Sequence, residues 1–197
     1  MKALILETST QKSFLLLAKE GIPVKSKLLL GGPELSRTLA KEASMLLENE
    51  PVDFLLVGQG PGSYTGIRVG AALAKGLSFG WNIPLYGFCS LKAFAPNEDG
   101  PFTVLVDAKM GGVYALSGKR RGDQIDTDLP RLIRLHELEP LLQNNQTIVS
   151  PTPTELMKRL PHLTPKEASP SFSSLAAWAF LPEFQTPLEL TYLSPFI

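Results

Sequence analysis

The sequence predicts an α/β protein in which helices cover a mixed β-sheet. Short apolar runs, typical of strands buried on both faces, recur along the first half of the chain. Two segments between these runs place apolar residues at helical spacing. The resulting order is three strands followed by alternating helices and strands, which fits a mixed sheet with covering helices.

The first strands follow from two apolar runs that a polar turn separates. Residues 3–6 and 14–18 are apolar, whereas residues 7–13 are mostly polar. This pattern predicts a hairpin whose strands are buried on both faces. Residues 24–30 are expected to form a third strand, which the Gly-Gly-Pro sequence at 31–33 ends.

Two helices and two further strands come next. Apolar residues at helical spacing predict a helix from about Glu34 to Glu48. A buried strand at 54–57 leads through a glycine-rich loop into a second helix from about Thr65 to Phe79. A strand at 85–88 then precedes a short helix that Ser90 can cap.

A polar segment rich in turn residues, Asn97–Pro101, is the best candidate for a boundary. We therefore expect a first lobe at residues 1–98 and a second lobe at residues 99–197. For the second lobe the patterns predict three strands and three helices. The strands are expected near 102–108, 113–117 and 148–149, and the helices near 136–143, 154–160 and 172–180.

Composition and charge exclude several classes of protein. The chain has 197 residues, and its 19 basic residues balance 19 acidic ones, so it lacks the broad basic field of most nucleic-acid-binding proteins. Cys89 is the only cysteine, so an intrachain disulfide is impossible and a reducing cytoplasm is expected. The apolar run after Met1 and Lys2 is too short for a signal peptide, and no run approaches the length of a membrane span.

The glycine-rich loop does not match the common nucleotide-binding motifs. Neither the P-loop pattern nor G-x-G-x-x-G fits the glycines at 58, 60 and 62. The backbone N–H groups of a loop that opens a helix could still bind an anion. Arg68 near the start of that helix either faces such an anion or extends into water. The loop residues of this candidate nucleotide or partner site are Gly60, Gly62, Ser63 and Arg68.

Catalytic and metal-binding patterns are few. Gly76–Gly80 matches the nucleophile elbow G-x-S-x-G, but a helix precedes its Ser78, and the end of a helix at Gly80 explains the same residues. His136 and His162 are too far apart for a two-histidine motif on one helix. Glu7 and Asp107 each follow an apolar strand; each could bind a metal–phosphate group or cap nearby backbone N–H groups.

Small residues recur every four positions along the second helix. Such a stripe lets another helix approach closely, and the first helix offers an apolar stripe to match it. One interpretation is that both stripes pack on the chain's own sheet; the other is that they form an association surface for a partner. The predicted partner interface consists of Gly66, Gly70, Ala74 and Ser78 on one helix and Leu35, Leu39, Ala43 and Leu46 on the other.

Four motifs cover most of residues 3–116. They are ILETST at 5–10, GQGPGSYTGIRVGAALAKGL at 58–77, IPLYGFCSLKAF at 83–94 and VLVDAKMGGVYAL at 104–116. These motifs resemble those of the tRNA threonylcarbamoyladenosine biosynthesis protein TsaB (YeaZ-like) family. There are three departures from the family pattern: Glu7 replaces a usual Asp, Leu35 stands where His is common, and the closing Tyr-Leu-Arg reads Tyr-Leu-Ser at 192–194.

The resemblance implies an actin-like (ASKHA, RNase H-like) fold in two lobes with mixed sheets and a shortened second lobe. It also implies a non-catalytic partner of a TsaD-type catalytic subunit, assembled with a TsaE-type ATPase. On this view tRNA binds only through the complex, no metal or cofactor belongs to this chain, and ATP or ADP could be held at the partner interface. Alone, the chain could pair with a second copy of itself.

Two enzymatic alternatives remain open from the sequence. The first is a small-molecule kinase or ATPase of the actin-like fold, and the weaker one is a peptidase. Against the kinase, no glycine follows Gly122, so the second lobe lacks the glycine-rich loop by which such folds approach an adenosine. Measurement of ATP hydrolysis would separate the kinase from the non-catalytic partner.

Overall fold

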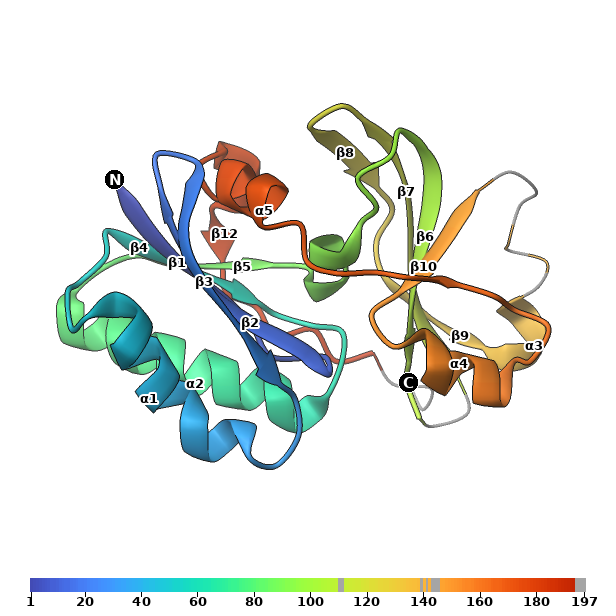
Figure 1. Ribbon diagram of the computed structural model, residues 1–197, viewed down its shortest axis with the longest axis horizontal. Helices are drawn as coiled ribbons and strands as arrows, with labels where there is room; N and C mark the ends of the chain where they lie inside the picture. The colour runs from blue at the N-terminus through green and yellow to red at the C-terminus, as the bar shows by residue number, and fades with distance from the viewer. Residues whose placement is uncertain (110–111, 139, 141, 143–145, 194–197) are drawn as a thin grey trace. The chain divides into compact units, whose positions relative to one another are not determined.

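The chain folds into two compact α/β units, each built on its own mixed sheet (Figure 1). The computed structural model describes residues 1–109, 112–138, 140, 142 and 146–193. The first unit comprises Met1–Ser90 and Phe172–Thr191, and the second comprises Leu91–Ser171 and the residues from Tyr192 onward. The predicted fold class, α/β in two lobes with mixed sheets, is confirmed.

The units differ from the expected division at residues 98 and 99. The chain enters the second unit at Leu91, and a later segment, 172–191, returns to the first. Within that segment α5 (Phe172–Ala179) packs on the first sheet, with the Phe172 ring 5.4 Å from that of Phe14. The two-residue strand β12 (Thr186–Pro187) pairs with the edge of the same sheet. The expected second lobe therefore included a segment whose packing belongs to the first.

The first sheet has the strand order β12-β5-β4-β1-β2-β3. Strands β1, β2 and β3 form an antiparallel meander, while β4 and β5 run parallel to β1. The predicted hairpin and third strand are confirmed. The bounds are Lys2–Glu7 for β1, Lys12–Lys19 for β2, Ile22–Leu30 for β3, Phe54–Gly58 for β4 and Leu85–Phe88 for β5.

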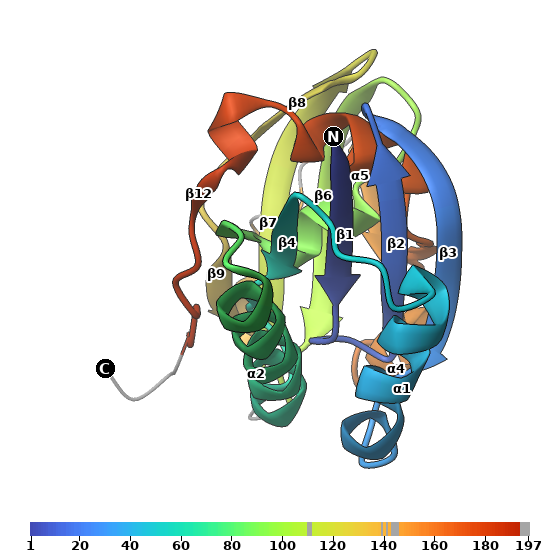
Figure 2. The same cartoon turned by 90° about the vertical axis from the view of Figure 1, so that its left-hand side faces the viewer.

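Two helices cover one face of this sheet, α1 (Leu35–Leu47) and α2 (Tyr64–Trp81), close to the predicted bounds. Figure 2 shows them side by side beneath the strands, while α5 lies on the opposite face in Figure 1. Their apolar residues join those of β1, β2 and β4 in one core cluster. The short helix expected after Ser90 is a 3-10 helix, Ser90–Phe94.

The second sheet has the order β11-β10-β6-β7-β8, and β9 also pairs with β7. Its strands are β6 (Gly100–Asp107), β7 (Gly112–Arg121), β8 (Gln124–Thr127), β9 (Arg131–Arg134), β10 (Thr147–Ser150) and β11 (Lys166–Glu167). The sequence analysis did not anticipate β8, β9 or β11.

The helices of the second unit are short. They are α3 (Leu135–Leu138) and α4 (Pro153–Arg159), and their apolar residues pack in a separate core cluster with β6, β7 and β9. The helix expected at 136–143 overlaps α3, but residues 139, 141 and 143 lie outside the described part of the chain. In the first unit, Pro182–Phe184 forms a 3-10 turn. No helix among the described residues is long and apolar enough to cross a membrane.

Candidate functional site

The glycine-rich loop between β4 and α2 is held closely against the end of β1. Gly60 has a positive φ of 97°, and its N–H donates to Ser90 Oγ at 2.9 Å. A Cβ on Gly62 would lie 2.6 Å from Cβ of Ser9, and Ser63 N donates to the Ser9 carbonyl at 2.7 Å. The glycines therefore permit close backbone approach within the chain itself.

Several backbone donors of this loop have partners inside the chain. Gln59 N donates to the Phe88 carbonyl at 2.9 Å, and Gly66 N donates to Ser63 Oγ, which caps α2. Together with the bonds made by Gly60 and Ser63, these contacts reduce the number of N–H groups that an anion could use. The loop's visible role is to turn the chain sharply from β4 into α2.

Arg68 lies on the exposed side of the first turns of α2. Its guanidinium carbon is 3.9 Å from the centre of the Tyr64 ring, which fits a cation–π contact. Tyr64 is itself 54% exposed. The two alternatives from the sequence were an anion partner and plain solvation, and the structure adds an aromatic partner within the same helix.

Glu7 ends β1 as a fully buried carboxylate. One oxygen, Oε1, accepts hydrogen bonds from the N–H and the hydroxyl of Ser9, so the capping role is confirmed. The other oxygen, Oε2, has no hydrogen-bond partner and lies where a Cβ on Gly58 would have to be. Burial raises the pKa of this carboxyl above its ordinary value, although hydrogen bonds from Ser9 and Ser90 oppose the shift.

Asp107 holds the corresponding place in the second unit, at the end of β6. It accepts a hydrogen bond from Lys109 N at 2.9 Å and forms an ion pair with Arg159 of α4. This carboxylate is thus also used for capping. Among the described residues no cluster of three metal-binding side chains occurs.

The predicted interface stripe of α2 faces the chain's own core rather than a partner. A Cβ on Gly66 would lie 2.0 Å from the Thr8 carbonyl oxygen, and one on Gly70 would lie 2.2 Å from Thr8 Oγ1. Ala74 is fully buried in the core cluster of the first unit. These small residues let α2 approach the loop after β1, so the assignment of this stripe to an association surface is wrong.

The assignment of the matching stripe of α1 to an association surface is wrong for the same reason. Leu35, Leu39 and Ala43 are buried in the cluster that α1 shares with the sheet, and Leu46 is partly buried against it. Ser78 donates its hydroxyl hydrogen to the Ile83 carbonyl at 2.7 Å, near the C-terminal end of α2. Ser78 therefore stabilises the end of a helix and does not lie on the strand-to-helix turn of a nucleophile elbow.

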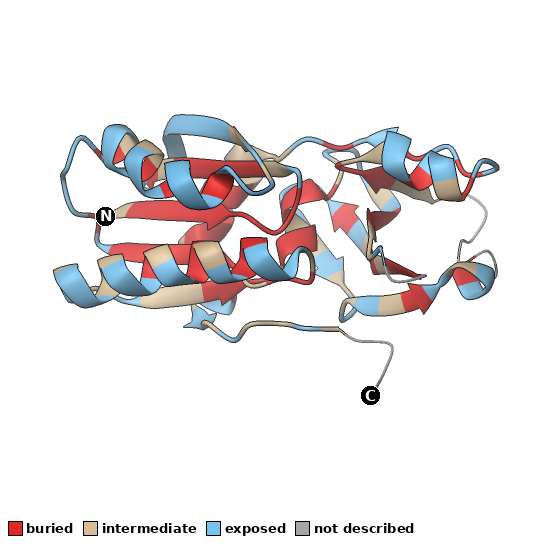
Figure 3. Cartoon of the chain, turned by 90° about the horizontal axis from the view of Figure 1, so that it is seen from below, coloured by how far each residue is buried: buried red, intermediate tan, exposed pale blue. Residues whose placement is uncertain are grey.

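A second row of small residues occupies the exposed side of α2. We call the small residues Ala72, Gly76 and Gly80, together with the large Phe79 beside them, the outer stripe; their spacing places them on one helix face. Figure 3 shows exposed segments alternating with buried ones along this helix. No atom lies within 4 Å of a Cβ built on Gly76 or Gly80, and Phe79 is 92% exposed. The packing of the first unit does not require Gly76, whereas Gly80 lies in the last turn of α2.

Sequence reasoning missed the outer stripe because α2 carries small residues on two faces. Periodicity shows that each row is continuous but does not show which one meets the sheet. Phe79 lies seven positions after Ala72 and four after Lys75, so it shares their helix face and not that of Gly66 and Gly70. This large aromatic residue was the signal in the sequence that α2 has a second face.

The fold defines a class, the α/β proteins built of two units that each have a mixed sheet. A sequence model described as "TsaD: tRNA N6-adenosine threonylcarbamoyltransferase" matches residues 33–179. The chain belongs to this family, and within it to the TsaB/YeaZ group. Members of that group are named for tRNA threonylcarbamoyladenosine biosynthesis.

Individual relatives support the same placement. An uncharacterized protein of Mycobacterium tuberculosis H37Rv is 32% identical over 154 residues, which cover 77% of this chain and 70% of that protein. The TsaB of Haemophilus influenzae is 41% identical over 68 residues, 32% of this chain, and the match spans only 29% of that relative's length. The solved structure of YeaZ from Pseudomonas aeruginosa shares the fold, with a TM-score of 0.77, 20% identity and coverage of 98% of this chain and 100% of that chain.

Proposed function

We propose that this chain is a non-catalytic partner subunit in the formation of tRNA threonylcarbamoyladenosine, pairing with a TsaD-type catalytic subunit. Membership of the TsaB/YeaZ group supports the pathway. The outer stripe of α2 is the single observation that carries the pairing. The stripe is an exposed helix face, and packing within this chain does not require its small residues.

The energetic argument concerns glycine in a helix. Each glycine in a helix interior destabilises the folded state by about 0.5–1 kcal/mol relative to alanine. Gly66 and Gly70 offset this cost by close contact with Thr8, whereas Gly76 faces open space. A partner helix that packs closely on the outer stripe would supply the missing compensation.

The neighbouring residues suit an apolar contact. Phe79 is 92% exposed and Met45 of α1 is 62% exposed. Val69, Leu73 and Leu77 of α2 are only partly covered by the core cluster. Apolar and aromatic anchors surrounded by a polar rim are typical of protein–protein interfaces.

The non-catalytic role rests on how the candidate groups are used. The loop donors bind the chain itself, Ser78 closes a helix, and Glu7 and Asp107 cap backbone N–H groups. The formal net charge of zero supports tRNA contact through the complex rather than through this chain alone. The remaining assignments follow from the family: a TsaE-type ATPase as a further partner, ATP or ADP at the partner interface, a homodimer when alone, and a cytoplasmic location.

The test introduces bulk into the outer stripe. Gly76→Leu should lower affinity for the TsaD-type subunit at least tenfold, or by about 1.4 kcal/mol, because it fills the space a partner helix needs. Thr154→Leu, at an exposed position of α4, is the matched control and should leave affinity unchanged. Affinity would be measured by calorimetry and folding by thermal unfolding. Unchanged affinity of a folded Gly76→Leu variant would overturn the interface.

ATP hydrolysis tests the alternative of a small-molecule kinase or ATPase. The purified chain should show no turnover above a buffer control. Turnover that Glu7→Gln abolishes would replace the non-catalytic role with that of an ATPase of the same fold.

A further inference from the structure

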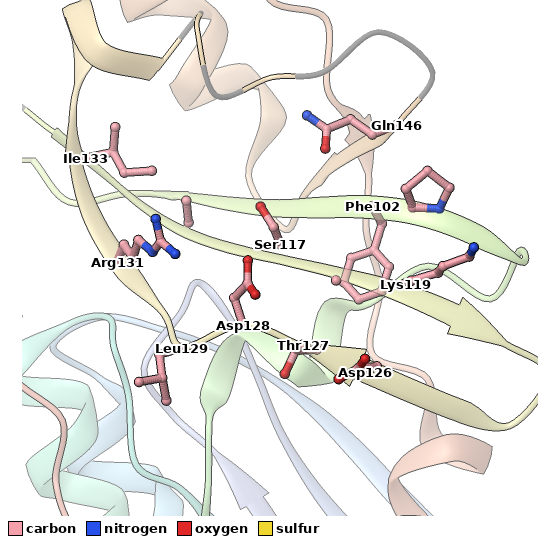
Figure 4. Close-up of a pocket in the computed structure, with 13 residues that line it drawn as sticks. Phe102, Ser117, Lys119, Asp126, Thr127, Asp128, Leu129, Arg131, Ile133 and Gln146 are labelled. Atoms are coloured by element: carbon pink, nitrogen blue, oxygen red, sulfur yellow. The ribbon is translucent and has the colours of Figure 1, made fainter.

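The second unit contains a pocket of about 400 Å³ at the point where β7 changes partner (Figure 4). Residues 112–115 of β7 pair with β9, and residues 118–121 pair with β8. The pocket lies over the transition between them, and all of its lining residues belong to the second unit. The glycine-rich loop and the outer stripe of α2 play no part in it.

The strand register explains which side chains line the pocket. Ser117 pairs with Thr103, Ala115 pairs with Arg131, and Lys119 pairs with Asp126. Paired residues lie on the same face of a sheet, and residues two apart on a strand share that face. Ala115, Ser117 and Lys119 therefore present their side chains together, on the face that α3 and α4 cover farther along the sheet.

A hydrogen-bond chain along this face has a defined direction. Thr103 Oγ1 donates to Gln146 Oε1 at 3.1 Å, which uses its single hydrogen. The 2.9 Å contact between Ser117 Oγ and Thr103 Oγ1 must then use the Ser117 hydrogen. Ser117 Oγ is left with lone pairs that can accept, while Gln146 Nε2 is buried and has no hydrogen-bond partner in the described structure.

The charged lining is balanced in sign and is not internally paired. Lys119 and Arg131 are basic, and Asp126 and Asp128 are acidic. None of the four side chains forms an ion pair or hydrogen bond with another residue that the structure describes. Figure 4 shows Arg131 and Asp128 on neighbouring sides of Ser117. Ala115 and Ile133 add an apolar wall.

We propose that this pocket binds a small zwitterion: the amino and carboxylate groups of an amino acid with an aliphatic side chain, either free or in a short peptide. The carboxylate lies against Arg131, whose side chain is exposed at the rim of the pocket. The ammonium lies against Asp128 and donates to Ser117 Oγ. The aliphatic side chain packs on Ala115 and Ile133. A polyanion such as a nucleoside triphosphate does not fit a lining with equal numbers of acids and bases.

The test uses the full chain and four defined probes. L-Leucine and the dipeptide leucyl-glycine represent the free and the peptide source. N-acetyl-L-leucinamide keeps the side chain without either charge, and ATP represents a polyanion. Amide chemical shifts measured by NMR would report both the affinity and the location of binding. We expect saturable shifts at residues 115–119 with L-leucine or leucyl-glycine, and at least tenfold weaker binding of the uncharged probe.

Variants separate recognition from non-specific contact. Arg131→Gln and Asp128→Asn should each weaken binding of the zwitterion at least tenfold. Arg121→Gln and Glu98→Gln, at exposed positions outside the pocket, are the matched controls and should bind as the unmodified chain does. Because Arg131 and Asp128 are exposed at the rim, both of their variants should fold.

Three outcomes would overturn the proposal. They are absence of saturable shifts up to about 10 mM of either zwitterion, equal affinity for N-acetyl-L-leucinamide, and unchanged binding by folded Arg131→Gln and Asp128→Asn variants. Preferential binding of ATP at residues 115–119 would also count against it. These results are independent of the partner affinity measured with Gly76→Leu, so the two proposals can fail separately.

Discussion

The two units share a strand plan but differ in the helices that cover it. In each unit the first strand pairs antiparallel with the second, and a later strand joins the first in parallel. The covering helices of the first unit have 13 and 18 residues, whereas α3 and α4 of the second have 4 and 7. At 1.5 Å per residue, α2 is about 27 Å long and α4 about 10 Å.

Helix length therefore determines how much of each sheet face is covered. Long helices cover the first sheet, bury its apolar residues and present a new outer face of their own, on which the outer stripe lies. Short helices leave part of the second sheet open, and the pocket occupies that part. One strand plan thus carries a proposed association surface in one unit and a candidate ligand pocket in the other.

The largest expected effect tests how the short helices of the second unit are held. Leu156 of α4 is fully buried in the core cluster, while its neighbour Met157 is 41% exposed. Leu156→Ala should lower the free energy of unfolding by about 2–5 kcal/mol, because it leaves a cavity beneath a helix with few other anchors. Met157→Ala should change it by less than about 0.5 kcal/mol. Denaturant unfolding of both variants checks this, and equal effects would contradict the difference in anchoring.

The next prediction compares the two faces of α2. Gly70→Ala should destabilise the fold by about 1–3 kcal/mol, since its Cβ would lie 2.2 Å from Thr8 Oγ1. Gly76→Ala should stabilise it by about 0.5–1 kcal/mol, because open space surrounds the added methyl group. Thermal unfolding of the two variants measures both signs. A stabilising Gly70→Ala would show that the inward stripe does not approach Thr8 closely.

Much of the first unit could be predicted from the sequence. Continuous apolar runs and helical periodicity placed β1, β2, β4 and both helices within a few residues. The strand β8 carries no comparable pattern because it is mostly polar and forms a tight hairpin with the end of β7. The strand β11 has only two residues, which are too few to show a pattern. The return of α5 to the first sheet also depends on contacts far apart in sequence, such as the one between Phe14 and Phe172.

The candidate site was harder to predict than the fold. The sequence showed that small residues on α2 need a close neighbour, but Thr8, the neighbour that selects the inward stripe, lies on a distant loop. The pocket gave no motif at all. Its lining comes from the cross-strand register of β7 with β6, β8 and β9, and two of those pairings involve strands that the sequence did not predict.

The acids that end the first strand of each unit differ in their surroundings. Glu7 ends β1 and Asp107 ends β6, so the two acids hold corresponding positions. Asp107 has Arg159 as a counter-ion, whereas Glu7 is buried with only hydroxyl and backbone donors, and one of its oxygens has no hydrogen-bond partner. A buried carboxylate without a counter-ion disfavours its charged form.

Glu7→Gln should therefore stabilise the fold at neutral pH by about 1 kcal/mol, because an uncharged amide can keep the acceptor role toward Ser9 and place an N–H group toward Ser90. The pKa of Glu7 is raised in the folded state, so between its unfolded and folded values the folded chain holds more protons than the unfolded chain. Stability contributed by the protonated acid is thus present at low pH and is lost as pH rises through the folded pKa. Chemical unfolding across this range should show that loss in the unmodified chain and not in Glu7→Gln.

Asp107→Asn, which loses an ion pair, should instead lower stability at neutral pH by about 0.5–1 kcal/mol. If Glu7→Gln destabilised the fold at neutral pH as Asp107→Asn does, the two carboxylates would be equally compensated and this difference between the units would disappear.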